Sequence, residues 1–152
     1  MKKEKRVIIG GTFDMLHAGH KALLRKAFQL GEVTIGLTSN IMARKIKKKE
    51  AEDFKYRKKE LEDFIAKEFK VEPKIVKIED KFGPTLQEDF DYIVVSPATC
   101  PTATLINQER QKRNKKPIKI VKIEFVLAED GKPISTTKIL KGEIDRQGKL
   151  LK

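Results

Sequence analysis

Two histidines, His17 and His20, stand three residues apart behind a short apolar run and a glycine pair. At that spacing a helical turn places both imidazoles on one side. The start of a helix offers free backbone N–H groups and the positive end of the helix dipole, which together favour an anion. Gly19 clears space there, and the preceding Gly10 and Gly11 let the backbone approach a ligand closely. The segment therefore predicts a cradle for a phosphate chain.

Other interpretations of this segment are weaker. A single histidine near a helix start is more often a cap or a packed core residue, but here two histidines follow a strand and a Gly-Gly-Thr turn. A metal site would need a third ligand at close spacing, which the segment lacks, so no protein-bound metal is predicted. The glycine spacing matches neither the Walker loop nor the dinucleotide-binding fingerprint.

A second polar cluster lies about 120 residues downstream, where three hydroxyl residues stand between Ile134 and Lys138. These are Ser135, Thr136 and Thr137. Hydroxyls at a helix start cap the helix and can also bind phosphate, and a lysine adds a point charge. Alone, this segment is an ordinary helix cap, so its meaning depends on whether it meets the histidines.

The densest positive charge lies in residues 44–59, which hold nine basic and three acidic side chains. We expect a mobile loop here that leads into a helix. Such a run can bind phosphates, although a solvated surface is the ordinary explanation for any single lysine. Binding of single-stranded nucleic acid would require interleaved aromatic rings. Only two aromatic residues lie nearby, so nucleic acid is not an expected partner.

The order of the apolar runs predicts the elements that must position these clusters. Buried strands are expected at 7–9, 33–37, 75–78, 92–95 and 118–123. Helices are expected around 23–28 with Gly31 at the C-cap, around 61–69 and 101–114, and from Ser135 to Gly142. This alternation predicts a Rossmann-like α/β fold, a doubly wound parallel sheet of about five strands in a single domain, 1–152. Ligands of such sheets bind beyond the carboxyl ends of the strands.

Composition narrows the class of protein. With 152 residues and 39% apolar side chains, the chain fits one globular domain. The single cysteine, Cys100, excludes an internal disulfide and favours a reducing compartment. No signal peptide or membrane span is apparent, so we expect a cytoplasmic protein without a membrane partner. The net charge of +12 suits small polyanions, and a surface rich in Lys and Glu is also typical of thermophiles.

The first cluster, Gly-Gly-Thr-Phe-Asp-x-x-His-x-Gly-His, resembles the His-x-Gly-His signature of the nucleotidylyltransferase superfamily. The second cluster is similar to its other signature, Ile-Ser-Ser-Thr-x-x-Arg. It departs in two places, because Thr136 replaces the second serine and Leu140 stands where the arginine is often found. Lys138 or Lys141 would then supply the missing charge.

Further segments, at 82–85, 92–99, 106–110 and 142–145, resemble archaeal phosphopantetheine adenylyltransferase, and the resemblance spans residues 5–148. It implies transfer of AMP from ATP to 4′-phosphopantetheine with Mg²⁺, which gives dephospho-coenzyme A and pyrophosphate in coenzyme A biosynthesis. The bacterial branch carries an arginine pair after the fourth strand, where this chain has Ser96 and Thr99. The acceptor pocket is therefore expected to be built differently.

The resemblance also implies roles for single residues. It gives His20 the α-phosphate, Lys45 and Thr12 the acceptor phosphate, and it leaves Arg44 and Lys47 as alternatives to Lys45. The residues it implies for nucleotide binding are Gly10, Gly11, Thr12, Phe13, Asp14, His17, His20, Asn107, Ile134, Ser135, Thr136, Thr137 and Lys138.

Rival functions stay open at this point. Ile-Ser-Thr-Thr also resembles cytidylyltransferases acting on glycerol 3-phosphate or a choline-type phosphate. Those relatives carry Arg-Thr shortly before the motif, whereas this chain has Glu-Asp-Gly-Lys-Pro at residues 129–133. Relatives that act on nicotinamide or flavin mononucleotide are further candidates. A non-enzymatic RNA- or nucleotide-binding module would instead show salt-dependent RNA affinity and no pyrophosphate release.

Overall fold

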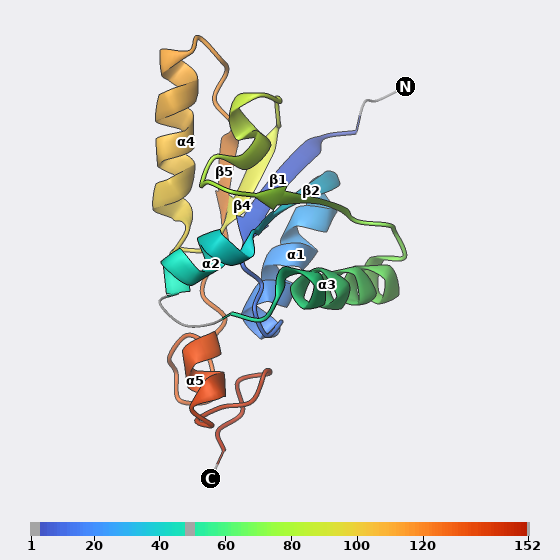
Figure 1. Cartoon of the computed structure of the whole chain (residues 1–152), viewed down its shortest axis with the longest axis vertical. Helices are drawn as coiled ribbons and strands as arrows, with labels where there is room; N and C mark the ends of the chain where they lie inside the picture. Colours follow the sequence, from blue (N-terminus) through green and yellow to red (C-terminus); the bar gives the residue numbers. More distant parts are fainter. Residues whose placement is uncertain (1–3, 48–50, 152) are drawn as a thin grey trace.

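The computed structural model describes residues 4–47 and 51–151, except for the side chains of Ile46 and Lys47. Its centre is a five-stranded parallel sheet of order β3-β2-β1-β4-β5 (Figure 1). The strands are β1 (Arg6–Gly11), β2 (Glu32–Thr38), β3 (Lys74–Ile78), β4 (Tyr92–Val95) and β5 (Lys119–Lys122). The chain builds outward from β1 to β3 and then returns to the other side of β1 for β4. The strand order therefore reverses between β1 and β4, which is where open α/β sheets bind ligands.

Helices cover both faces of the sheet. They are α1 (Ala18–Leu30), α2 (Asn40–Lys47), α3 (Phe54–Phe69), the 3₁₀ turn η1 (Gly83–Leu86), α4 (Cys100–Lys112) and α5 (Thr136–Leu140). Alternate side chains of β1 point to opposite faces. Val7 and Ile9 pack with α1 and α3, whereas Ile8 packs with α4. This explains the unbroken apolar runs, because each central strand is buried on both sides.

Beyond β5 the chain leaves the sheet and forms a small C-terminal lobe, residues 124–151, at the carboxyl ends of the strands (Figure 1). Two isolated bridges, Leu127 with Pro133 and Ile144 with Leu150, hold it together. Its helix α5 ends where expected, since Gly142 has φ 73° and donates its N–H to the Ile139 carbonyl. The lobe thus brings the second polar cluster to the ligand-binding edge of the sheet.

The five predicted strands and the doubly wound architecture are confirmed, and one local prediction is wrong. Arg44 and Lys45 lie in helix α2 and not in a loop. Ser39 starts this helix, because its Oγ accepts the N–H of Met42 at 3.1 Å. Because lysine and arginine are good helix formers, the first part of this charged run forms a helix and not a loop. Lys48 and Lys49 lie outside the described residues. No helix in the described ranges is long and apolar enough to cross a membrane.

Arg110 of α4 is 1% exposed and ties α4 to two loops. Its guanidinium donates to the carbonyls of Thr85, Glu88 and Lys116 at 2.6, 3.1 and 2.7 Å, and to the Asp89 carboxylate at 2.7 Å. The Arg110 hydrogen bond also lowers the pKa of the Asp89 carboxyl. One side chain thus fixes the segment before β4 and the loop after α4.

We predict that Arg110→Met lowers the free energy of unfolding by roughly 3 kcal/mol, because several carbonyls lose their donor together. The matched control is Arg113→Met, which removes an exposed ion pair with Glu109 and should change stability by less than about 0.5 kcal/mol. Urea denaturation of both variants measures the difference. Equal losses of stability in the two variants would contradict the claim that Arg110 holds these segments to α4.

Candidate active site

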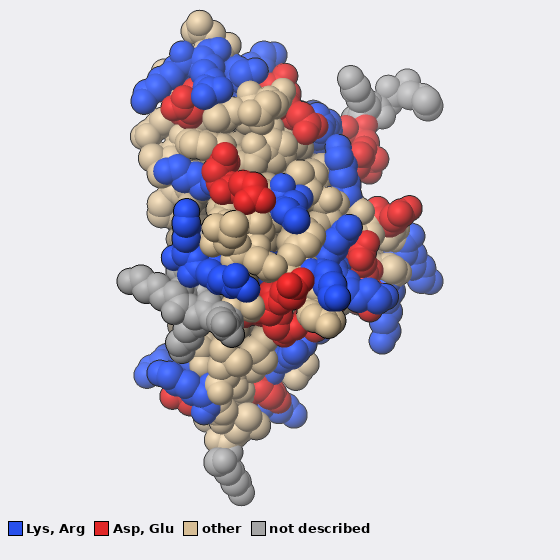
Figure 2. All heavy atoms as spheres, viewed as in Figure 1, with Lys and Arg blue, Asp and Glu red and all other residues tan. Residues whose placement is uncertain are grey.

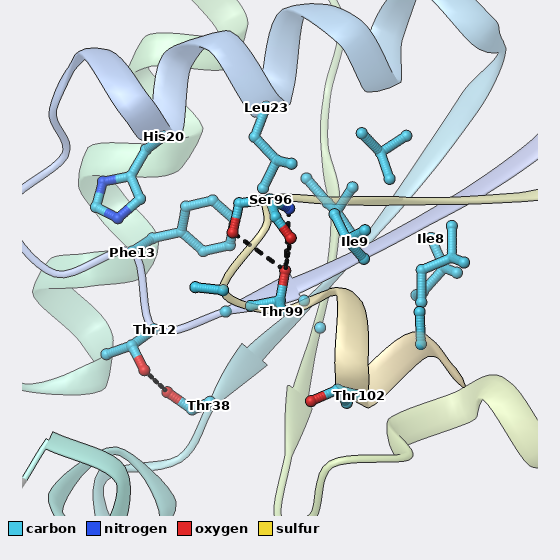
Figure 3. A pocket seen from close by; sticks show the side chains of 18 of the residues that line it. Ile8, Ile9, Thr12, Phe13, His20, Leu23, Thr38, Ser96, Thr99 and Thr102 are labelled. Atoms are coloured by element: carbon cyan, nitrogen blue, oxygen red, sulfur yellow. Dashed lines mark hydrogen bonds between the residues drawn. The ribbon is translucent and has the colours of Figure 1, made fainter. Parts of the chain in front are cut away.

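A cavity of about 480 Å³ opens at the carboxyl ends of β1, β2 and β4 (Figure 3). One wall comes from the loop after β1 and the start of α1, and includes Thr12, His17 and His20. The opposite wall comes from η1, from α4 and from the segments directly before α4 and after β5. Its residues include Phe82, Pro84, Ser96, Thr99, Thr102 and Ile106. The cavity therefore lies at the topological switch point of the sheet, as the sequence predicts.

The two imidazoles lie on one side of α1 and are held by backbone groups. His17 is the N-cap, and its Nδ1 accepts the Gly19 N–H at 3.0 Å. The Nδ1 of His20 accepts the His17 N–H at 3.1 Å, and the two rings stack with their centroids 3.8 Å apart. Because each Nδ1 is an acceptor, each neutral ring carries its proton on Nε2. Both residues line the cavity.

The backbone amides at this helix start differ from expectation. The Ala18 N–H is bonded to the Arg146 carbonyl at 2.9 Å, and the Gly19 N–H is taken by His17. The prediction of free amides for an anion is therefore wrong for the first two positions of α1. Gly19 is needed because a Cβ there would lie 2.9 Å from Cε1 of His17. The glycine clears space for an imidazole and not directly for a ligand.

The loop between β1 and α1 is strained. Phe13 and Met15 have φ of 49° and 48°, in the left-handed region that bulky residues rarely adopt. Phe13 is 3% exposed, and its ring lies 5.3 Å from that of His20. Strain of this kind persists only when the surroundings fix it. Here it turns Thr12 and His20 toward one cavity (Figure 3).

One buried hydrogen bond joins the two polar clusters. Thr136 Oγ1 donates to the Asp14 carbonyl at 3.1 Å, across 122 residues of chain. The neighbouring Ile134 lines the cavity, and Ser135 caps α5 by accepting the Lys138 N–H at 3.2 Å. The hydroxyl cluster therefore lies beside the histidine loop, which is the juxtaposition that the sequence motifs require.

Comparison with known proteins agrees with this geometry. Residues 8–142 match the cytidylyltransferase-like family. The chain belongs to that family. It is 49% identical over 152 residues to the phosphopantetheine adenylyltransferase of Methanosarcina mazei, covering 97% of both chains. It is also 45% identical over 148 residues to that of Archaeoglobus fulgidus, covering 96% of this chain and 99% of the relative. The predicted resemblance to the archaeal group is confirmed.

Solved structures support the same fold. A protein of unknown function from Archaeoglobus fulgidus superposes with a TM-score of 0.75 at 42% identity, covering 78% of this chain and 88% of the other. The tyrosyl-tRNA synthetase from the same organism superposes with a TM-score of 0.64 at 15% identity, covering 90% of this chain and 60% of the other. The second likeness concerns the fold alone.

Several residues that sequence reasoning assigns to the site of this family member do line the cavity. They are Gly10, Gly11, Thr12, Phe13, His17, His20 and Ile134. Asp14 is not among the lining residues, and its carboxylate accepts the Glu52 N–H at 3.2 Å. Thr136 supports the site from behind, and Thr137 is exposed. Lys138 is paired with Asp130 at 3.2 Å, so its charge is already engaged.

Two further predicted residues lie away from the cavity lining. Asn107 donates to the Ile118 carbonyl and accepts the Ile118 N–H, both at 2.8 Å. Its amide therefore clamps the start of β5 to α4. Lys45 is exposed on α2, three residues after Met42, which does line the cavity. Arg44 is exposed as well, and the side chain of Lys47 lies outside the described residues.

Sequence reasoning missed Arg57 and Lys81. Arg57 is 1% exposed and donates to the carbonyls of Thr12 and Glu52 at 3.0 and 2.7 Å. Burial lowers its pKa from the ordinary value, while the negative charge of Asp14, the largest opposing cause, raises it. Its spacing of four and eight residues from the buried Leu61 and Ile65 could have revealed it.

Lys81 lines the cavity on the side of β3. Its ammonium lies 5.5 Å from the centre of the Phe82 ring. The preceding Asp80 fixes this turn by accepting the N–H groups of Phe82 and Gly83, both at 2.9 Å. A single lysine in a chain this basic gives no signal in the sequence, so only the fold could identify it.

We predict that Thr136→Val lowers the free energy of unfolding by about 1–2 kcal/mol, because the buried Asp14 carbonyl loses its donor. Thr137→Val is the matched control, since it makes the same change at the exposed neighbour and should have an effect within about 0.5 kcal/mol. Chemical denaturation compares the two. If both variants match the parent, Thr136 does not join the clusters energetically.

Proposed function

We propose that this chain is a phosphopantetheine adenylyltransferase, which transfers AMP from ATP to 4′-phosphopantetheine and releases dephospho-coenzyme A and pyrophosphate. The relatives that bear this name match nearly the whole chain. The observation that carries the proposal is the buried hydrogen bond from Thr136 to the Asp14 carbonyl, which holds the hydroxyl cluster against the loop whose imidazoles line the cavity. Two motifs that are far apart in sequence thereby form one site.

The proposed reaction requires no covalent bond between the protein and a substrate. The acceptor phosphate is already an anion, so it attacks the α-phosphorus in line while pyrophosphate leaves, and no general base is needed. Catalysis then consists of positioning and of stabilising developing charge. We assign the Nε2–H of His20 to the α-phosphate and the bridging oxygen, and that of His17 to the triphosphate. Both donors are fixed before substrate arrives, since backbone N–H groups hold each Nδ1.

The remaining roles follow the walls of the cavity. We assign the acceptor phosphate to Thr12, which lines the cavity, and to Lys45, which is exposed on α2 three residues after Met42. We assign the β- and γ-phosphates to Ser135 of the C-terminal lobe, while the Thr136 hydroxyl, which donates to the Asp14 carbonyl, holds the lobe against the histidine loop. The apolar wall at Phe82 and Ile106 suits a base or an uncharged arm.

The binding partners we propose are these small molecules, not nucleic acid. Figure 2 shows basic and acidic side chains interleaved over the visible face, whereas a nucleic-acid site concentrates one sign of charge. We place the reaction in the cytoplasm, in keeping with the single cysteine.

Mg²⁺ fits this site as part of the substrate. Among the described residues no group of three or more His, Cys, Asp and Glu could hold a metal ion. Mg²⁺ commonly binds through substrate phosphates with few protein ligands. We therefore propose that it enters with ATP, where it neutralises part of the triphosphate charge.

The metal proposal predicts two separate responses to a chelator. EDTA should abolish pyrophosphate release, because ATP loses its Mg²⁺. It should leave the melting temperature of the ligand-free protein within about 1 °C, because only a metal bound to the native protein before ATP arrives would raise that temperature and be removed by EDTA. Differential scanning calorimetry and a pyrophosphate assay measure the two. A drop of several degrees without ATP would reveal a resident metal.

Substitution of His20 separates its structural and catalytic contacts. In His20→Asn the amide oxygen replaces Nδ1 and keeps the cap on the His17 N–H, but the Nε2–H donor is lost. We expect a kcat lower by roughly 100- to 1000-fold, with the KM for ATP and the melting temperature nearly unchanged. His20→Ala should lower kcat similarly and also lose the cap.

The control is His20→Gln, whose amide N–H reaches toward the Nε2 position while the cap is lost. It should be less stable than His20→Asn and yet more active. If His20→Asn keeps most of its turnover, His20 has no catalytic role.

The acceptor is tested with ATP or CTP against 4′-phosphopantetheine, glycerol 3-phosphate and nicotinamide mononucleotide. We expect pyrophosphate only from ATP with 4′-phosphopantetheine, and turnover of CTP with glycerol 3-phosphate would favour the cytidylyltransferase alternative.

A further inference from the structure

A buried chain of hydrogen bonds leads from α3 to the cavity wall. Nη1 of Arg57 donates to Thr38 Oγ1 at 3.3 Å, and Thr38 Oγ1 donates to Thr12 Oγ1 at 3.0 Å. All three residues are buried, with exposures of 1%, 2% and 8%. Thr12 and Thr38 line the cavity, and Figure 3 shows their contact at its edge.

The direction of this chain is fixed by the chemistry of its first member. A guanidinium has only donors, so Thr38 Oγ1 must accept from Arg57. The single hydroxyl hydrogen of Thr38 is then given to Thr12 Oγ1. Thr12 Oγ1 is thereby an acceptor on its inner side, and its own hydrogen points elsewhere. Among the residues that the structure describes, Thr38 is the sole hydrogen-bond partner of this hydroxyl.

Arg57 is itself held rigidly. Nη1 also donates to the Thr12 carbonyl, Nε to the Glu52 carbonyl and Nη2 to Asn40 Oδ1 at 3.2 Å. The same side chain therefore fixes the backbone of Thr12 and, through Thr38, the rotation of its hydroxyl. Successive hydrogen bonds that start at a cation polarise one another in a buried environment.

We propose that Arg57 and Thr38 are positioning residues, which set the Thr12 hydroxyl as a donor to a phosphate oxygen in the cavity. In this relay, meaning Arg57, Thr38 and Thr12 in that order, the Thr12 hydroxyl is oriented so that it donates its hydrogen. This inference rests on the proposed function for the identity of the phosphate ligand. A purely structural role for Thr38 would stabilise the loop without affecting any ligand through Thr12.

A double-mutant cycle separates these roles. Thr12→Val, Thr38→Val and the double variant are compared by titration calorimetry with 4′-phosphopantetheine and, separately, inorganic pyrophosphate. Thr12→Val should weaken at least one of these ligands roughly 10- to 100-fold, the range for a hydrogen bond to a charged group. Thr38→Val should weaken the same ligand in the parent protein, but by less than about twofold in the Thr12→Val background. Thr38→Ser keeps the hydroxyl and should retain affinity within about threefold.

Each outcome decides the relay. Independent, multiplying losses from Thr12→Val and Thr38→Val would overturn it, as would a Thr12→Val protein that binds both ligands within about twofold of the parent. Thr38 carries the test because Arg57→Met removes several structural hydrogen bonds at once. The proposed function is judged apart, from pyrophosphate release by the unmodified protein with ATP and 4′-phosphopantetheine. A parent protein that binds pyrophosphate without turnover would refute the reaction, while the cycle with pyrophosphate would still decide the relay.

Discussion

The active-site geometry depends on two backbone N–H groups that occupy the Nδ1 atoms of two histidines at the start of α1. This reciprocal capping fixes the tautomer and the rotation of His17 and His20 through backbone groups. It also requires Gly19, since a side chain there would displace the His17 ring. The same two hydrogen bonds thus cap the start of the helix and hold the two imidazole rings in place. Preorganised donors of this kind cost no reorganisation during the reaction.

Buried arginines serve the same purpose on both sides of the sheet. Among the Lys and Arg side chains of the described chain, Arg57 and Arg110 are the buried ones, and each donates to backbone carbonyls outside the strands. Burying a charge is unfavourable unless hydrogen bonds satisfy it, so these positions must be geometrically exact in the fold. Arg110 fixes the loops around α4, and Arg57 fixes the loop after β1. The walls of the cavity are therefore held from behind by cations that never enter it.

The sheet and the histidine pair could be predicted because they rest on local signals. Unbroken Val and Ile runs identify strands buried on both faces, and His17-x-Gly19-His20 is a compact motif. The surroundings of other residues depend on distant partners. Asn107 was expected at the nucleotide, but its amide pairs with the Ile118 backbone, a contact set by how α4 meets β5. Gly31 was correctly placed at the C-cap, yet its backbone is extended, and a Cβ there would collide with the Lys5 carbonyl.

The C-terminal lobe depends on the rest of the molecule for its stability. Its own core consists of Ala128, Ile134 and Ile144, packed against Ala18 of α1. Three buried side chains contribute too little to order some 28 residues alone, since each ordered residue costs about 1–2 kcal/mol of backbone entropy. Attachment includes the bonds to Ala18 and Asp14 at the start of α1 and its loop, and the ion pair of Arg146 with Glu60 of α3 at 3.2 Å. A ligand held by both parts would stabilise the lobe by mass action. If the proposed triphosphate is such a ligand, its binding would stabilise the lobe through the contacts that bring the two motifs together.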